Sequence, residues 1–185
     1  CSVPKDLRGD LCADSNYRGI TLNSPIGKVM DLLFLERNSE MLQTSDAQFA
    51  FKAGRSTSMC TVLVKEVAKY YSQRGSKVVS AFLDASKAFD MVKYDKLFNL
   101  LIMRGVQAID IRALLDLYSR QTLRTIWQGK VSRTFRTTNG IRQGAIASPV
   151  LFCIYINALL ERLRTNAMVV GLVHIMLVLS ATQMI

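Results

Sequence analysis

The sequence contains few of the residues that form zinc sites or disulfide frameworks. Among 185 residues it has one histidine and four cysteines, and no two cysteines are spaced as Cys-x-x-Cys. His174 has no cysteine near it in the sequence, so the usual spacing of a structural zinc site is missing. We therefore expect four free, reduced thiols that serve in packing: Cys1, Cys12, Cys60 and Cys153.

Long hydrophobic runs are also missing. The most apolar stretch, Ala167 to Leu179, has 13 residues and contains Gly171, whereas a membrane-crossing helix needs about 20. We expect buried β-structure there and no membrane partner. The chain begins without methionine, and its first residues show neither an apolar core nor an amphipathic basic helix. No targeting segment is therefore predicted, and the start reads as a cut from something longer.

The sequence does contain positive charge on a globular composition. The formal net charge is +10 and half of the residues are hydrophobic. A chain of this length buries roughly 70% of its unfolded surface, so we expect a single domain. Clustered Lys and Arg side chains gain affinity by displacing phosphate counterions, which makes nucleic acid the first candidate partner. Ribosomal proteins, membrane-surface proteins and heparin binders are equally basic, so charge alone leaves the partner open.

Two helices are predicted in the first half of the chain. Ser24-Pro25 is an N-cap followed by a proline at the first helical position, so a helix begins there and runs to about Leu42. The apolar residues on one face of this helix are Ile26, Val29, Met30 and Leu33. A second helix follows the loop QFAFKAGRST, and Gly75 is placed to end it. Its repeating apolar positions are Met59, Leu63, Val67 and Tyr70.

The middle of the chain mixes a strand, two helices and a hairpin. The run from Lys77 to Asp84 is β-branched and aromatic, which predicts a buried strand. Helices are expected around Asp95–Arg104 and Asp110–Tyr118, with Gly105 between them. The stretch Thr122–Thr138 alternates polar and apolar residues around a Gln-Gly pair, which is typical of a β-hairpin.

A last helix is predicted where Ser148-Pro149 repeats the cap-and-proline pattern. Its apolar positions continue down to about Arg164, and they are Leu151, Ile154, Tyr155, Ala158 and Leu159. Helices therefore interleave with a few strands that are not adjacent in the sequence. This order favours an α+β fold, in which helices pack on one side of a small, mostly antiparallel sheet.

The candidate chemistry lies in the segment AFLDASKAFD. Asp84 ends the apolar strand, and Asp90 follows six residues later. A carboxylate at a strand end suits a divalent metal, because the sheet fixes its oxygens while the loop leaves coordination sites open. The alternative is that both residues only end a strand and cap the next segment, and spacing alone favours this alternative.

Four sequence blocks, taken together, favour the metal-binding interpretation over the capping one. SNYRGITLNSPIGKV, QFAFKAGRST, FLDASKAFD and NGIRQGAIASPVLF stand in the order of the reverse transcriptase blocks, and the chain closely resembles the reverse transcriptases of non-LTR (LINE-type) retrotransposons from Val3 to about Arg164. The resemblance implies an α+β fold of fingers (about 1–75) and palm (about 76–185), with the thumb absent. It also implies an RNA-directed DNA polymerase that uses Mg²⁺ and takes an RNA template, a DNA primer and deoxynucleotide triphosphates.

The resemblance also implies roles for particular residues. Asp84 matches the first metal-binding carboxylate, and Phe89 matches the gate that excludes a 2′-hydroxyl; its alternative is an ordinary core aromatic. Residues expected at the nucleotide are Lys52, Arg55, Arg142, Gln143 and Gly144. Arg18 and Lys28 are expected at the template. For the four basic residues of the first two blocks, a solvated surface charge stays open as an alternative.

The sequence departs from this family at one place. The family carries an aromatic-Ala-Asp-Asp turn that supplies the remaining metal-binding carboxylates, but the matching region reads GLVHIMLVLSATQ and no Asp or Glu follows Glu161. Asp84 would have to hold two cations almost alone, leaving their repulsion largely uncompensated. His174 is a poor substitute, because imidazole prefers softer metals than Mg²⁺. We therefore expect catalysis to be lost.

Two hypotheses follow for function. In the first, the chain is a reverse transcriptase domain whose activity is lost; in the second, it is a non-catalytic RNA- or DNA-binding remnant. A purely structural α+β protein is a third reading. The sequence encodes no choice between nucleus and cytoplasm, and it says nothing about oligomeric state.

Overall fold

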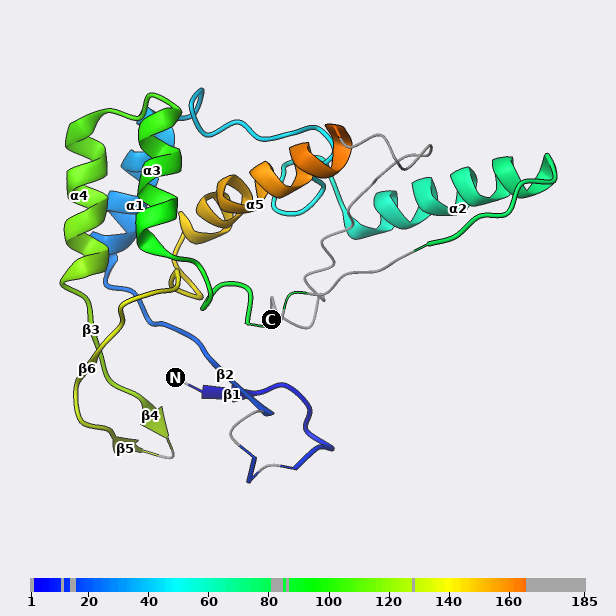
Figure 1. Ribbon diagram of the computed structural model, residues 1–185. Coiled ribbons are helices and arrows are strands. Elements are labelled where there is room, and N and C mark those ends of the chain that lie inside the picture. Colours follow the sequence, from blue (N-terminus) through cyan, green and yellow to red (C-terminus); the bar gives the residue numbers. More distant parts are fainter. Residues whose placement is uncertain are drawn as a thin grey trace. The chain divides into compact units, whose positions relative to one another are not determined.

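The structure is a computed structural model that describes residues 2–10, 12–13, 16–80, 85, 87–127 and 129–165 (Figure 1). The helices in this part of the chain are α1 (Pro25–Arg37), α2 (Thr57–Gln73), α3 (Tyr94–Met103), α4 (Ala108–Ser119) and α5 (Ser148–Thr165). The strands are β1 (Ser2–Pro4), β2 (Tyr17–Gly19), β3 (Thr122–Leu123), β4 (Ile126–Trp127), β5 (Lys130–Val131) and β6 (Phe135–Arg136). Among the described residues, every strand pairing is antiparallel and joins two strands only: β1 with β2, β3 with β6, and β4 with β5. The predicted α+β character is confirmed at this level.

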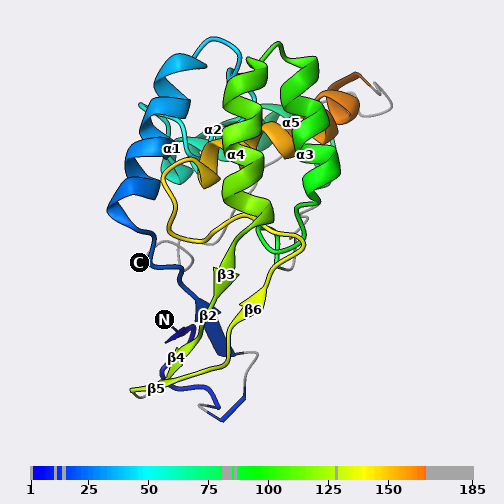
Figure 2. The same cartoon turned by 90° about the vertical axis from the view of Figure 1, so that its left-hand side faces the viewer.

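The chain forms two compact units, each made of two segments. The first unit contains residues 1–43 and 87–155, and the second contains 44–86 and 156–185. Within the first unit, α1, α3 and α4 stand beside one another above the strand pairs (Figure 2). None of the helices in the described ranges is long and apolar enough to span a bilayer.

Helix α1 begins where its cap residues predict. The Ser24 hydroxyl accepts a hydrogen bond from the Gly27 amide at 3.1 Å, and Pro25 is the first helical residue. The helix ends at Arg37 rather than near Leu42, because Asn38 becomes the C-cap and turns follow it. The Asn38 side-chain amide also donates to the Phe34 carbonyl at 3.0 Å, which accepts the Asn38 backbone amide at 3.2 Å as well.

The apolar face expected on α1 is not its buried face. Ile26, Val29 and Leu33 are exposed, whereas Asp31 and Phe34 are buried together with the Gly27 backbone. The reason is that Asp31 finds hydrogen-bond donors inside the first unit, so this polar side chain turns toward the core. The part of the predicted apolar face that Ile26, Val29 and Leu33 form therefore lies at the surface rather than in the core.

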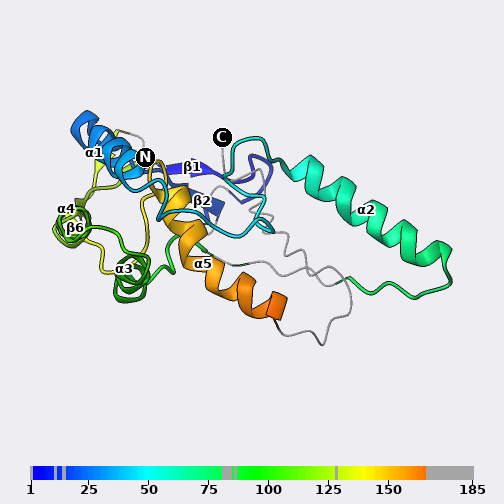
Figure 3. The same cartoon turned by 90° about the horizontal axis from the view of Figure 1, so that it is seen from above.

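The remaining helices follow their sequence signals closely. In α2 the Ser56 hydroxyl accepts from the Met59 amide at 3.3 Å, and Gly75 has φ +78° just after the cap residue Arg74. Gly105, with φ +82°, separates α3 from α4 as predicted. Viewed from above, both of these helices are seen nearly end-on, so their axes run close to parallel (Figure 3).

The core of the first unit lies among α3, α4 and the first half of α5. Among its fully buried side chains are Leu97, Leu101, Tyr118, Leu151 and Ile154. Burial raises the pKa of the Tyr118 hydroxyl, although contacts with Ser148 and Arg142 act in the opposite direction. Burial likewise raises the pKa of the Cys60 thiol in α2, and Cys12, Cys60 and Cys153 are all free, as predicted.

The predicted hairpin is present as a two-stranded ribbon. It consists of two successive strand pairs, or steps: β3 with β6 and β4 with β5. Thr122 lies opposite Arg136 in the first step, and Trp127 lies opposite Lys130 in the second. Between the two steps, the Ser132 amide donates to the Thr125 carbonyl and the Ser132 hydroxyl accepts from the Thr125 amide, both at 2.9 Å. Gly129 supplies the positive φ of +76° at the tip.

The strand predicted from Lys77 to Asp84 is not found where the structure describes it. Residues 77–80 are exposed and form no strand, and Val79 has 92% of its surface exposed. β-propensity alone does not make a strand, and none of the strands in the described ranges pairs with residues 77–80. Residues 81–84, like the expected strand around Met168–Val170, lie outside the described residues.

Candidate nucleic-acid site

The turn that follows the candidate metal-binding segment is tied to the loop before α5. Asp84 itself lies outside the described residues. After it, the Ile141 amide donates to the Phe89 carbonyl at 3.0 Å, and the Gly140 amide donates to the Val92 carbonyl at 2.8 Å. Gly140 has φ +87°, and a Cβ there would lie 3.0 Å from the Asp90 Cα. Glycine therefore allows the two backbones to approach this closely.

Phe89, the expected gate, packs against helix α5. Its ring stacks on Phe152 with centroids 4.8 Å apart and planes 15° apart. The Phe89 side chain is half-buried, whereas Phe152 is buried. This contact fits the core-aromatic alternative as readily as the gate, so the gate stays a prediction.

Arg142 is the most deeply buried of the expected nucleotide-binding side chains, with 8% of its surface exposed. Its Nη1 donates to the Asn23 Oδ1 at 3.0 Å, and its guanidinium carbon lies 5.0 Å from the centre of the Tyr118 ring. Its Nη2 is 3.9 Å from the Asp31 Oδ1, which is within ion-pair range and too long for a hydrogen bond. The Nε and Nη2 atoms have no hydrogen-bond partner.

Asp31 organises the start of α5 from the neighbouring helix α1. Its Oδ2 accepts the amides of Ile146 at 3.0 Å and Ala147 at 3.4 Å, just before α5 begins. A carboxylate at this place also faces the positive end of the α5 dipole. Sequence reasoning missed Asp31, although a lone carboxylate between apolar helix positions is a usable signal for a buried polar anchor.

Gln143 and Gly144 join this loop to the segment after β2. The Gln143 carbonyl accepts from the Thr21 amide at 2.8 Å, and its side-chain amide lies 3.5 Å from the Asp90 carboxylate. Gly144 has φ +104°, and a Cβ there would lie 2.8 Å from the Thr21 carbonyl oxygen. The Gln-Gly pair is therefore fixed by backbone contact across the first unit.

A pocket of about 380 Å³ opens between these segments. Arg142 and Gln143 line it, together with Asp90 and Arg124; Phe89 and Gly144 are not among its lining residues. Its other polar walls come from Ser2, Thr21, Gln121, Thr122, Thr125, Thr137 and Asn139. The buried Gln121 Oε1 has no hydrogen-bond partner. Two cationic side chains, one carboxylate and unsatisfied polar atoms give this pocket the chemistry that suits a polar, anionic ligand.

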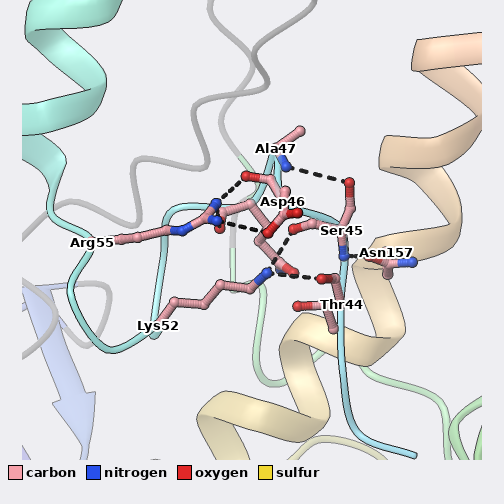
Figure 4. Close-up of polar contacts among 8 residues, drawn as sticks. Thr44, Ser45, Asp46, Ala47, Lys52, Arg55 and Asn157 are labelled. Carbon is pink, nitrogen blue, oxygen red and sulfur yellow. Dashed lines mark hydrogen bonds and ion pairs between the residues drawn. The ribbon is translucent and has the colours of Figure 1, made fainter.

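Lys52 and Arg55 lie in the second unit, where the side chains of both bind residues of their own loop (Figure 4). The Lys52 Nζ donates to the carbonyls of Thr44 at 2.8 Å and Ser45 at 2.7 Å. The Arg55 guanidinium pairs with the Asp46 carboxylate at 2.7 Å and also donates to the Asp46 carbonyl. The two cations thus hold the loop together, and their expected contact with a triphosphate stays a prediction.

This loop gives a testable contrast between a cation and its exposed partner. We expect Asp46→Ala to change the free energy of unfolding by less than about 1 kcal/mol, because its side chain is 94% exposed and exposed ion pairs are weak. Arg55→Ala removes a charged donor to the Asp46 and Gln48 carbonyls and the guanidinium contact with the Phe49 ring, so we expect a loss of about 1–3 kcal/mol. Hydrogen exchange of residues 44–56 measures this local effect. Equal exchange in the two variants would contradict it.

The expected template residues are less constrained. Lys28 is an exposed residue in the first turn of α1. Arg18 lies in β2 opposite Val3, and its side chain is outside the described part. Their template role stays a prediction.

The described residues do not supply a magnesium site. No group of three or more His, Cys, Asp or Glu side chains in the described ranges is placed to share a metal ion. In the full sequence, no acidic residue follows Glu161 that could join Asp84. Mg²⁺ requires several hard oxygen ligands in near-octahedral geometry. Loss of the metal site stays a prediction, because Asp84 lies outside the described residues.

The chain belongs to the reverse transcriptase family. The family described as "Reverse transcriptase (RNA-dependent DNA polymerase)" matches residues 4–178. Members of this family act on nucleic acids and generally use a divalent metal.

Within that family, the domain is related to the reverse transcriptases of non-LTR retrotransposons. It is 29% identical over 164 residues to the "Putative 115 kDa protein in type-1 retrotransposable element R1DM" of Drosophila melanogaster, covering 88% of this chain and 16% of that protein. It is 27% identical over 150 residues to the "Probable RNA-directed DNA polymerase from transposon X-element" of the same organism, covering 76% and 16%. It is also 27% identical over 165 residues to the "Retrovirus-related Pol polyprotein from type-1 retrotransposable element R2" of Popillia japonica, covering 87% and 22%. The chain thus spans less than a quarter of the length of these relatives.

Proposed function

We propose that this chain is a fingers-and-palm part of a non-LTR retrotransposon reverse transcriptase, that it binds RNA and DNA, and that it does not extend a primer. The single observation behind the loss of synthesis is the absence of any Asp or Glu after Glu161. Family membership through residue 178 makes that absence meaningful, because the family match covers the region in which the acidic turn is expected.

The binding half of the proposal rests on charge and on the pocket. The net charge of +10 gives a sequence-independent attraction to phosphates. In the first unit, the buried Arg142 guanidinium and the Gln143 amide line a pocket with room for part of a nucleotide. Asp31 and Asn23 hold Arg142 in place, so this cation is pre-positioned rather than recruited.

The test is primer extension beside a binding measurement on the same preparation. The purified chain is incubated with a labelled DNA primer annealed to an RNA template, the four deoxynucleotides and Mg²⁺. We expect no extension from the chain or from Asp84→Ala, and equal, salt-sensitive binding of the primer–template by both. A full-length relative of known activity controls for substrate quality.

The outcomes test the two parts of the proposal, loss of primer extension and binding of nucleic acid, separately. Extension that disappears in Asp84→Ala would show a working metal site and overturn the loss of catalysis. Failure of the chain to bind the primer–template even at low salt would overturn the binding half. Binding that does not weaken with salt would also count against it, because phosphate contacts release counterions.

A further inference from the structure

The charge of the first unit is concentrated in one stretch of the chain. Between Leu117 and Leu160 the sequence contains no Asp or Glu and six basic residues. Four of the six lie on the ribbon formed by β3 to β6, namely Arg124, Lys130, Arg133 and Arg136. All four are exposed. No carboxylate of the described ranges forms an ion pair with any of them.

The ribbon holds these cations in a defined order. The Arg124 Nε donates to the Thr134 hydroxyl at 2.9 Å, so the step between the two strand pairs is closed by side chains as well as by backbone. Lys130 lies opposite Trp127 near the tip, and Arg136 lies opposite Thr122 near the base. At about 3.3 Å per residue, the arm from Lys130 to Arg136 extends roughly 20 Å. A row of cations of this length matches several successive phosphates.

Aromatic side chains are interleaved with the charge. Trp127 has 37% of its surface exposed and Phe135 has 45%. The Trp127 ring is held edge-to-face by Tyr17 of β2, with centroids 4.3 Å apart and planes 71° apart. An exposed aromatic ring fixed beside cations is the combination that binds single strands, because unpaired bases stack on the ring while phosphates meet the charges.

We propose that the β3–β6 ribbon binds single-stranded nucleic acid without sequence preference, with Lys130, Arg133 and Arg136 on phosphates and Trp127 as a base-stacking platform. This inference rests on the proposed binding function and names a second surface for it, next to the pocket that Arg124 and Phe135 of the same ribbon help to line. A duplex is disfavoured as the ligand, because its base faces are already stacked and give Trp127 nothing to bind. An anionic membrane is the competing ligand, and the test includes it.

The experiment uses the single tryptophan of the chain as a positional probe. Titration of the intact chain with a 20-mer of uridylate is expected to quench Trp127 emission. A labelled copy of the same RNA gives the affinity over a series of salt concentrations. In the variant Lys130→Gln/Arg133→Gln/Arg136→Gln, we expect the salt slope of log K to fall by about 2, because each single-strand phosphate contact contributes about 0.7. Arg124 is left intact because it closes the ribbon.

A control variant removes the same charge elsewhere. Lys69→Gln/Lys93→Gln/Arg112→Gln changes three exposed cations outside the ribbon, and we expect its salt slope and its quenching to match the unmodified chain. Equal slopes for the ribbon variant and the control would overturn the ribbon proposal while leaving the binding function standing. RNA binding without quenching, or equal quenching by vesicles of anionic lipid, would also overturn it. Absence of any RNA binding by the unmodified chain would end both proposals.

Discussion

Asp31→Asn is expected to lower the free energy of unfolding by about 3–5 kcal/mol, the range measured when one member of a buried charge pair is removed. The Asp31 side chain is 1% exposed and faces Arg142, which is 8% exposed. Asparagine keeps the shape but removes the negative charge, so the guanidinium is left buried with Asn23 as its hydrogen-bonded partner. The amides of Ile146 and Ala147 also meet a weaker acceptor, or an amide hydrogen if the side chain flips. Urea denaturation followed by far-ultraviolet circular dichroism measures the loss.

Two further variants show whether the buried pair is the cause. Asp95→Asn removes an exposed carboxylate from the first turn of α3, and we expect it to cost less than about 1 kcal/mol, since dipole contacts at exposed sites are small. The double variant Asp31→Leu/Arg142→Met removes both charges, and we expect it to recover much of the loss, as apolar replacements of buried pairs often do. An Asp31→Asn protein as stable as Asp95→Asn would mean that Arg142 is solvated after all.

The elements that could be predicted from the sequence are those fixed by neighbouring residues. Ser24 caps the helix that follows it, and Gly75 and Gly105 take the positive φ that ends a helix. These signals act within one helical turn, so they do not depend on the rest of the fold. The hairpin around Gly129 belongs to the same group, because its turn and its pairing partners are adjacent in the chain.

The features that could not be predicted depend on distant partners. The buried face of α1 is set by Asp31 meeting residues 146 and 147, more than 100 positions away. A hydrophobic pattern carries no information about such a contact, so it does not indicate that Ile26, Val29 and Leu33 are exposed. The exposed segment 77–80 fails as a strand for the same reason, since its residue types fit a strand but pairing needs a second strand.

In the candidate site, too, sequence indicates the residues that are neighbours in the chain but not their distant partners. Family resemblance places Arg142 and Gln143 together because they are adjacent in one block, and the structure brings both to the pocket. It does not indicate that Asn23 and Asp31 hold the guanidinium, or that Lys52 and Arg55 are engaged by carbonyls of their own loop. A sequence block identifies the residues of the candidate site. Their hydrogen-bond partners depend on the folded structure and cannot be read from the block.

Gly144→Ala is expected to lower the free energy of unfolding by about 2–5 kcal/mol. A positive φ costs an L side chain roughly 1–2 kcal/mol, and forcing an atom into filled space adds about 1–3 kcal/mol. The added Cβ would lie 2.8 Å from the Thr21 carbonyl oxygen, so the backbone must shift, and the 2.8 Å hydrogen bond from the Thr21 amide to the Gln143 carbonyl is strained.

Gly105→Ala is the matched control, because Gly105 has a similar φ of +82° and nothing lies within 4 Å of its added Cβ. It should show the conformational cost alone, so the difference between the two variants measures the contact with Thr21. Because residues 20–22 and 139–143 line one pocket and are hydrogen-bonded to each other, the same difference should appear as weaker primer–template binding by Gly144→Ala alone. If both variants lose equal stability and bind equally well, the segment after β2 moves freely, and the pocket is not held by this junction.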